Sequence, residues 1–407
     1  MSKSGVCLEK KEKNGYTGRM RIAIFGGSFD PVHTQHVSLA EAAIRDLRLD
    51  RLFVMPAAAP PHKIGKTLTS DTARLRMCEL AFAPLEKVEI SDHEIAQGGL
   101  SYTYLTCRHF RTLYPDAEIF WLVGTDMLRD FPTWKHPESI LNDVTLAVCA
   151  RAEQDGWAER ERAAFLRRFG KEFALVGYNG EDVSSTRIRV LAGAGESVEA
   201  FVGKEVADYI VENGLYKIAG ADAALALEKP TRKAHSLRVA ETAAKKAVEM
   251  RLSERKAIAA GLFHDCAKNL EKDSPLLSGF ALEKEWGNVP EPVLHQFAGA
   301  YVAQTAFGVG DEEILNAIRY HTSGRADMGE LEKLVFLADM VEEERIYEGV
   351  EKLRALFWEK KGAGALDECL ERALGETVIY LKKKGADVYP LTLEAYEFIK
   401  KQRKSEV

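Results

Sequence analysis

The chain has 407 residues, of which 46% are hydrophobic and 29% are charged, and its formal net charge is −6 at pH 7. Because this length exceeds what one hydrophobic core usually supports, we expect two domains of ordinary size. The composition excludes a disordered chain, no apolar run is long enough to cross a bilayer, and the negative charge is not that of a protein that binds duplex nucleic acid.

Residues 1–18 are polar and lysine-rich and lack the apolar stretch of a secretory signal, so they predict a loose extension on a cytoplasmic protein. The six cysteines are scattered without a CxxC pair, which argues against a disulfide framework and against a thiolate zinc site. The expected partners are small anionic molecules, with no nucleic acid and no membrane. Oligomer formation is left open.

Residues 19–217 alternate short β-branched runs with helical stretches. The runs are RIAIF, RLFVMPA, KVEISD, EIFWLVG and VTLAVCA. This alternation predicts an α/β doubly wound parallel sheet of the Rossmann-like kind. In residues 230–407 strand signals vanish and apolar residues follow helical spacing, which predicts an all-α domain. The segment 218–229 is alanine-rich and runs up to Pro230, so we expect it to be a linker.

The first run leads into the segment GGSFDPVHTQH. Adjacent glycines at a turn let backbone N–H groups approach phosphate oxygens, and the N-terminus of the following helix attracts the same anions. His33 and His36 lie near that helix start and can donate hydrogen bonds to the α- and β-phosphates of a nucleotide. Without further signals, the same residues would suit an ordinary turn and two surface histidines.

The segment GGSFDPVHTQH resembles the GG(S/T)FDPxHxGH signature of nucleotidyltransferases with HxGH motifs. The later segments APPHK, SYTYLT, GTDM, PTWKHPESIL and VSSTRIR resemble bacterial nicotinate-nucleotide adenylyltransferase. The resemblance implies transfer of AMP from ATP, which brings Mg²⁺ with it, to nicotinate mononucleotide, giving deamido-NAD and pyrophosphate. It implies His33, His36 and Arg189 as catalytic residues. The ATP site that it implies comprises Gly26, Gly27, Ser28, Phe29, His33, His36, Asp126, Ser185, Thr186 and Arg189.

The resemblance also implies a site for nicotinate mononucleotide, made of Lys63, Tyr102, Thr103 and Trp134. Flat aromatic faces such as those of Tyr102 and Trp134 can stack on a pyridine ring, although both could simply pack in the core. Lys63 would contact a phosphate or lie solvated in its loop.

Chemistry supports the roles of the ATP residues. Ser185 and Thr186 are natural helix-capping residues, and Arg189 lies one turn on, where it can neutralise a triphosphate. Asp126 follows a strand, at the edge where open α/β sheets bind ligands. One residue departs from the family, because Gln35 stands where the signature has glycine. We hypothesise that this glutamine crowds the adenine or ribose and weakens a working site.

The second half carries histidine and aspartate residues on separate helical segments. Such residues can converge inside a helical bundle, where imidazole and carboxylate suit iron, manganese or similar divalent ions. One histidine alone on an apolar helix face would instead be a core residue. The candidate ligands are His235, His264, Asp265, His295, His321 and Asp339.

The order H…HD…H…H…D resembles the HD superfamily of metal-dependent phosphohydrolases. AHSLRVAETA, GLFHDCAK, AIRYHTSG and LEKLVFLADMVE resemble its YqeK-type branch, regarded as symmetrical diadenosine tetraphosphate hydrolases with a di-iron centre. The resemblance implies hydrolysis to two ADP by two divalent metals, with iron expected. One metal would be held by His235, His264, Asp265 and Asp339, and the other by Asp265, His295 and His321. Asp265 and Lys268 would be catalytic, although Lys268 could equally be an exposed lysine at a helix end.

Three alternatives remain open on sequence alone. The transferase could use nicotinamide mononucleotide or another phosphorylated acceptor, and the HD half could hydrolyse another nucleotide. One half could also act as a nucleotide-sensing module that regulates the other. This alternative is considered because Gln35 replaces the signature glycine in the N-terminal half.

Overall fold

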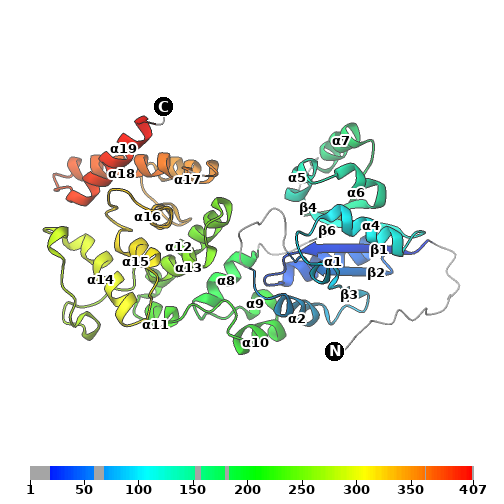
Figure 1. Cartoon of the computed structure of the whole chain (residues 1–407), viewed down its shortest axis with the longest axis horizontal. Helices are drawn as coiled ribbons and strands as arrows, with labels where there is room; N and C mark the ends of the chain where they lie inside the picture. Colours follow the sequence, from blue (N-terminus) through cyan, green and yellow to red (C-terminus); the bar gives the residue numbers. More distant parts are fainter. Residues whose placement is uncertain (1–18, 59–67, 152–156, 179–182, 363, 406–407) are drawn as a thin grey trace.

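The computed structural model describes residues 19–58, 68–151, 157–178, 183–362 and 364–405. The N-terminal half is built on a parallel sheet (Figure 1). The sheet has six strands in the order β3-β2-β1-β4-β5-β6. The strands are β1 (Arg21–Gly27), β2 (Arg51–Pro56), β3 (Val88–Ile90), β4 (Glu118–Gly124), β5 (Thr145–Arg151) and β6 (Ala174–Tyr178). The expected α/β doubly wound fold is confirmed, and β6 is a strand that the sequence analysis missed.

Alternate residues of the strands face two cores, as the period of a strand requires. Ala23 and Phe25 belong to the core on one face of the sheet, whereas Ile22 and Ile24 belong to the core on the other. The first core is closed by α1 (Thr34–Asp46), α2 (Asp71–Phe82), α8 (Ser185–Gly193), α9 (Glu199–Val202) and α10 (Lys204–Glu212). Around the second lie α4 (Thr103–Leu113), α5 (Thr125–Asp130), the 3₁₀ helix η2 (Phe131–Thr133), α6 (Pro137–Asp143) and α7 (Trp157–Phe169). The short helix α3 (His93–Gln97) follows β3.

The C-terminal half is all-α, as expected, over the residues that are described from 219 onward (Figure 1). Its first helices are α11 (Ala221–Ala226), α12 (Pro230–Met250) and α13 (Glu254–Phe263). They are followed by η3 (Pro275–Leu277), η4 (Lys284–Trp286), α14 (Glu291–Thr305), α15 (Glu312–Arg319) and α16 (Glu330–Val341). The last are α17 (Val350–Glu359), α18 (Asp367–Lys383) and α19 (Pro390–Ser405).

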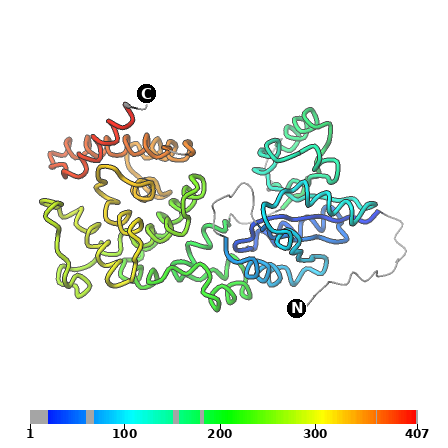
Figure 2. The backbone as a smooth tube through the Cα atoms, viewed as in Figure 1, coloured from blue at the N-terminus to red at the C-terminus, as the bar shows by residue number. Residues whose placement is uncertain are grey.

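The segment 218–229 differs from an open linker. It contains α11, whose residues Ala221, Ala224 and Leu225 are buried in one apolar core together with Val190 of α8 and Leu262 of α13. The alanines that looked like a flexible connection are therefore small core residues. The two halves consequently meet through a packed helical region, which Figure 2 traces in green between them.

Helix α12 begins at Pro230, directly after the expected linker. Pro230 occupies its first turn, where proline has a favourable φ and no N–H to leave unsatisfied. Among the described residues, no helix combines the length and the apolar character needed to cross a membrane.

Candidate active sites

Strand β1 ends in the two glycines of the signature. Both are paired with β2, Gly26 with Met55 and Gly27 with Pro56, so the expected glycine turn is still strand and the chain turns only after it. A Cβ atom at Gly26 would lie 2.9 Å from the ring of Trp121 on β4. Glycine is thus required here for packing between strands, a reason that the motif alone did not reveal.

His33 and His36 stand together at the start of α1. His33 is the N-cap residue, its ring is stacked on that of His36 with centroids 3.7 Å apart, and its backbone N–H donates to Nδ1 of His36 at 3.1 Å. His33 is 5% exposed, and burial lowers its pKa to about 4. At neutral pH the His33 ring is therefore uncharged and can act only as a neutral hydrogen-bonding group.

The start of α8 is attached to the loop between β1 and α1. Ser184 caps the helix by accepting a hydrogen bond from the Arg187 N–H at 3.2 Å, so the cap lies one residue before the expected Ser185. The Ser185 hydroxyl donates to the Pro31 carbonyl at 3.1 Å, and Arg189 donates to the carbonyl of Asp30. The structure therefore brings Ser185 and Arg189 to the loop that carries Ser28 and Phe29 and leads into His33.

The same loop is held from other directions by residues that the sequence analysis missed. The buried Asp30 carboxylate accepts hydrogen bonds from the Tyr216 hydroxyl at 2.7 Å and from the Thr69 N–H at 3.3 Å. The Arg74 side chain, 0% exposed, donates to the carbonyl of Ser28 at 2.9 Å. No local pattern marks these contacts, because their partners are distant in the chain.

The residues expected at the acceptor site lie on the other side of the sheet. Thr103 begins α4, and the ammonium group of Lys135 lies 4.1 Å from the ring centre of the preceding residue, Tyr102. Lys135 directly follows Trp134, whose ring packs on Phe131 with centroids 5.4 Å apart. The structure thus joins the segment of Trp134 to Tyr102 and adds Lys135, a cation that the motif contains but that was not singled out.

Two further expected residues have different outcomes. Asp126 is exposed near the start of α5, just beyond the carboxyl end of β4, and its carboxylate lies over Gly124. It is therefore at the edge of the sheet where ligands bind in this type of fold. Lys63 lies outside the described residues.

Gln35, the departure from the family signature, reaches toward β6. Its amide donates a hydrogen bond to the hydroxyl of Tyr178 at 3.0 Å, and Tyr178 is the last residue of that strand. The glutamine side chain therefore spans from the start of α1 to the carboxyl end of β6. This places its bulk along the same edge of the sheet as His36.

In the C-terminal half, all of the predicted metal ligands come together. Their ligand atoms form three overlapping groups, each with its atoms within 4.8 Å of one another. The groups are His235, His264 and Asp265; His264, His321 and Asp339; and Asp265, His295 and His321. Asp265 thus links the His235 side of the cluster to the His295 side, in agreement with the shared role that the resemblance implies.

Two of these histidines are oriented by the helix ends that carry them. His264 directly follows α13 and its Nδ1 lies 2.7 Å from the Gly261 carbonyl, while Nδ1 of His321, just after α15, lies 2.8 Å from the Ile318 carbonyl. Each ring thereby satisfies a carbonyl that the helix terminus leaves without an intrahelical donor. With the proton on Nδ1, the lone pair on Nε2 points to the cluster, as a metal ligand requires.

Close contact between α12 and α13 brings His235 near His264. A Cβ atom at Gly261 would lie only 2.5 Å from the Cα of Ala240, so only glycine permits this approach of the two backbones. The rings of His235 and His264 are consequently 5.4 Å apart between centroids. The small residues Ala240 and Gly261 therefore allow the close helix contact that brings the two histidines together.

The charge state of the cluster suits cation binding. Burial lowers the pKa of His264 and of His295 to about 4, so both imidazoles are neutral at pH 7. Burial alone would raise the pKa of Asp265, but the nearby His264, His295 and His321 outweigh it and hold this pKa well below its usual range. His264 and His295 therefore offer neutral imidazoles beside the ionised carboxylate of Asp265, whereas hydrogen bonds to Asp339 and Glu342 outweigh burial and raise the pKa of His235.

Two buried atoms of the cluster, His264 Nε2 and Asp265 Oδ1, make no hydrogen bond to any residue that the structure describes. Buried polar atoms are normally paired, so an orphaned imidazole nitrogen beside an orphaned carboxylate oxygen fits a bound divalent cation. His235 adds the typical outer support of a metal ligand, since its Nδ1 lies 3.1 Å from a Glu342 carboxylate oxygen and its Nε2 lies 2.8 Å from Asp339.

Cations surround this cluster. Arg232 donates to Asp265 Oδ2 at 2.9 Å, Arg345 contacts Asp339, and Arg238 donates to Glu342 at 2.7 Å. These arginines line a cavity of about 540 Å³ beside His235. Sequence analysis missed all of them, although Arg232 lies three residues before His235, a spacing that places both on one helix face.

Lys268 also belongs to this region. Its ammonium nitrogen lies 2.9 Å from Nε2 of His295 and 4.0 Å from Asp265, and its side chain is 33% exposed. Burial lowers its pKa from the usual value. Of the two interpretations left open, a lysine at the cluster fits these contacts better than a fully solvated helix-end residue.

Comparisons with known proteins match each half separately and both together. A Cytidylyltransferase-like family model matches residues 24–191 and an HD domain model matches residues 232–344. A probable nicotinate-nucleotide adenylyltransferase/Ap4A hydrolase from Mycoplasma genitalium is 30% identical over 331 residues, covering 80% of this chain and 89% of the relative. A probable nicotinate-nucleotide adenylyltransferase from Clostridium tetani is 33% identical over 199 residues, which are 48% of this chain and 98% of the relative.

A solved structure matches part of the chain. It is described as a predicted HD superfamily hydrolase involved in NAD metabolism from Clostridium acetobutylicum, is 30% identical, and covers 45% of this chain and 95% of its own with a TM-score of 0.39. The relative from Mycoplasma, which matches across both halves, decides the assignment. The chain belongs to the family of nicotinate-nucleotide adenylyltransferases fused to Ap4A hydrolases.

Proposed function

We propose that the chain is a bifunctional cytoplasmic enzyme whose two activities reside in residues 19–217 and 230–407, on either side of α11. The first half transfers AMP from Mg²⁺-bound ATP to nicotinate mononucleotide and releases pyrophosphate. The second half hydrolyses diadenosine tetraphosphate symmetrically to two ADP. The main support for this assignment is the relative from Mycoplasma genitalium. Its name gives both activities, and it matches this chain across both halves.

The adenylyl transfer needs alignment and charge neutralisation more than acid–base chemistry, since the attacking phosphate is already anionic at neutral pH. His33, which is neutral, and His36 supply hydrogen-bond donors at the start of α1, and Arg189 on α8 supplies a positive charge beside the same loop. Tyr102 and Trp134, with Lys135 over the tyrosine ring, supply aromatic and cationic groups for a pyridine nucleotide. These groups suit the proposed donor and acceptor.

For the hydrolase, the observation that carries the proposal is the pair of orphaned atoms on His264 and Asp265 inside a cluster of buried ligands. Two divalent metals, which we propose to be iron, would be held by the ligand sets given above and would supply a nucleophilic hydroxide at neutral pH. The residues themselves orient the substrate: Arg232, Arg238 and Arg345 line the adjoining cavity and can pair with polyphosphate oxygens.

Two assays on the purified chain test this proposal. With Mg²⁺, ATP and nicotinate mononucleotide we expect pyrophosphate and deamido-NAD, and with diadenosine tetraphosphate we expect ADP as the sole nucleotide product. Metal analysis of the same sample should find about two divalent ions per chain. A panel containing nicotinamide mononucleotide and other dinucleotides decides the substrates. ATP and AMP as products, in place of ADP, would contradict the symmetrical cleavage.

Gln35 gives a separate prediction for the first activity. Replacing Gln35 by glycine removes the side chain that extends from α1 to Tyr178, so we expect the KM for ATP to fall while the KM for nicotinate mononucleotide stays unchanged. Tyr178→Phe is the matched control, because it removes the hydrogen bond and keeps the glutamine in place. An unchanged KM for ATP in Gln35→Gly would show that the glutamine does not crowd the nucleotide.

A further inference from the structure

A carboxylate of the C-terminal half reaches the ATP residues of the N-terminal half. Glu254 is the first residue of α13, and its side chain is 9% exposed. One of its oxygens, Oε1, accepts a hydrogen bond from the Thr186 hydroxyl at 3.2 Å and also contacts a terminal nitrogen of Arg189. Both partners lie on α8 and are residues expected to hold the triphosphate of ATP.

This contact occurs where the two halves are packed firmly together. Val190 of α8 and Ile258 of α13 lie in one buried apolar core. Lys233 of α12 forms an ion pair with Glu196 at 2.5 Å, and Arg255 donates to the Lys217 carbonyl at 2.7 Å. Glu254 is therefore held against α8 by the surrounding interface.

Protein groups engage both terminal nitrogens of the Arg189 guanidinium. Its Nη1 donates to the Asp30 carbonyl, and its Nη2 donates to the Thr186 hydroxyl at 2.9 Å and contacts Glu254. The Nε atom is buried and makes no hydrogen bond to any described residue. While the ion pair with Glu254 persists, both N–H groups of Nη2 are occupied, and the donors left for an anion are the Nε–H and the second N–H of Nη1.

The ion pair changes what α8 offers to ATP. A triphosphate is attracted by the positive charge of Arg189, but the Glu254 carboxylate cancels that charge at contact distance. Oε1 also accepts the Thr186 hydroxyl proton, which a phosphate oxygen would otherwise receive. Because Glu254 and the triphosphate are both anionic and need the same donors, they compete.

We propose that Glu254 of the HD half is part of the nucleotide site of the N-terminal half, where it competes with the ATP triphosphate for Arg189 and Thr186 and sets the affinity for ATP. This inference rests on the proposed assignment of ATP to the N-terminal half. It adds a residue from the other half, on the helix that ends at the metal ligand His264. An adenylyltransferase without the HD half would lack this competitor.

The test compares Glu254→Gln with the matched variant Glu196→Gln in the full-length, metal-loaded protein. Both variants remove one negative charge and weaken one ion pair between the halves, but only Glu254 contacts Arg189. We expect Glu254→Gln to bind Mg²⁺-ATP about five-fold more tightly, the lower end of typical couplings between sites. Its KM for ATP should fall likewise, while the KM for nicotinate mononucleotide and all constants of Glu196→Gln stay at wild-type values.

Glu254→Asp separates charge from mere packing, because it keeps the carboxylate. We expect it to bind ATP more weakly than Glu254→Gln. Equal affinity in these two variants, or unchanged or weaker ATP binding in Glu254→Gln, overturns the inference. Calorimetric titration with ATP keeps this result separate from the proposed reaction: if no variant forms deamido-NAD, the assigned acceptor is wrong, whereas the titration still decides the role of Glu254. Any ATP that binds in the HD half contributes equally to each variant.

Discussion

Asp265→Asn should abolish hydrolysis of diadenosine tetraphosphate and leave adenylyl transfer intact. Asp265 is the residue that links both sides of the cluster, with Oδ1 3.2 Å from His295 Nε2 and 3.5 Å from His321 Nε2, and with Oδ2 3.6 Å from His264 Nε2. Asparagine keeps the shape of the side chain but removes its negative charge. It also replaces one carboxylate oxygen by an amide NH₂ group, which cannot ligate a cation. Since loss of an outer partner of a ligand already costs about 10- to 100-fold, loss of this ligand should exceed about 100-fold in rate.

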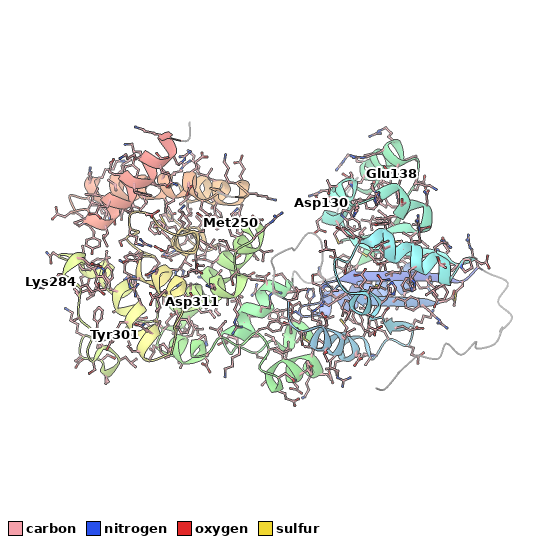
Figure 3. All side chains as sticks on the ribbon, in the orientation of Figure 1. Asp130, Glu138, Met250, Lys284, Tyr301 and Asp311 are labelled. Atoms are coloured by element: carbon pink, nitrogen blue, oxygen red, sulfur yellow. The ribbon has the colours of Figure 1, made fainter. Side chains whose placement is uncertain are left out.

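The measurements are the rate of ADP formation, the metal content and the rate of deamido-NAD formation. Asp311→Asn is the matched control, because it makes the same chemical change in the same half. Asp311, labelled in Figure 3, pairs with Lys256 near the start of α15 and is not one of the cluster residues. We expect that control to keep its metal and both activities. Retention of metal and of ADP formation in Asp265→Asn would contradict the proposed centre, and loss of both activities would point to misfolding.

The fold could be predicted largely because its signals are local. Five of the strands have β-branched or aromatic runs bounded by turn residues, and the helices of the second half have clear apolar spacing. Strand β6 was not predicted because its five residues, ALVGY, include a glycine and form an edge strand. An edge strand pairs with one neighbouring strand only, so fewer of its side chains must be apolar. The helix in 218–229 escaped because small alanines give a weak apolar signal until a partner surface is known.

The candidate sites show the same division between local and tertiary information. The metal ligands could be named from their order in the chain, but the reason that they meet, the contact of Gly261 with Ala240, depends on how α12 crosses α13. The hydrogen-bond partner of Gln35 and the contact of Glu254 with Arg189 were hidden for a like reason. Each joins residues far apart in the chain, and no spacing rule connects them.

His36→Asn should reduce the kcat of adenylyl transfer by about 100-fold, the cost of removing one donor to a developing negative charge. Nδ1 of His36 accepts the His33 N–H, so in the neutral ring the proton lies on Nε2, where it can be donated to a phosphate. The amide oxygen of asparagine can accept the same N–H at the start of α1, but asparagine has no group at the position of Nε2. The substitution therefore separates the catalytic donor from the capping contact.

His36→Ala removes both functions, so we expect a similar loss of kcat together with a loss of about 1 kcal/mol in the free energy of unfolding. His109→Asn is the matched control, because His109 stacks on His93 at 3.8 Å between centroids, a similar histidine pair away from α1. Its kcat should equal that of the wild type. If His36→Asn kept the wild-type kcat at saturating ATP and nicotinate mononucleotide, the ring would serve only to cap α1, and charge stabilisation would have to come from His33 and Arg189 alone.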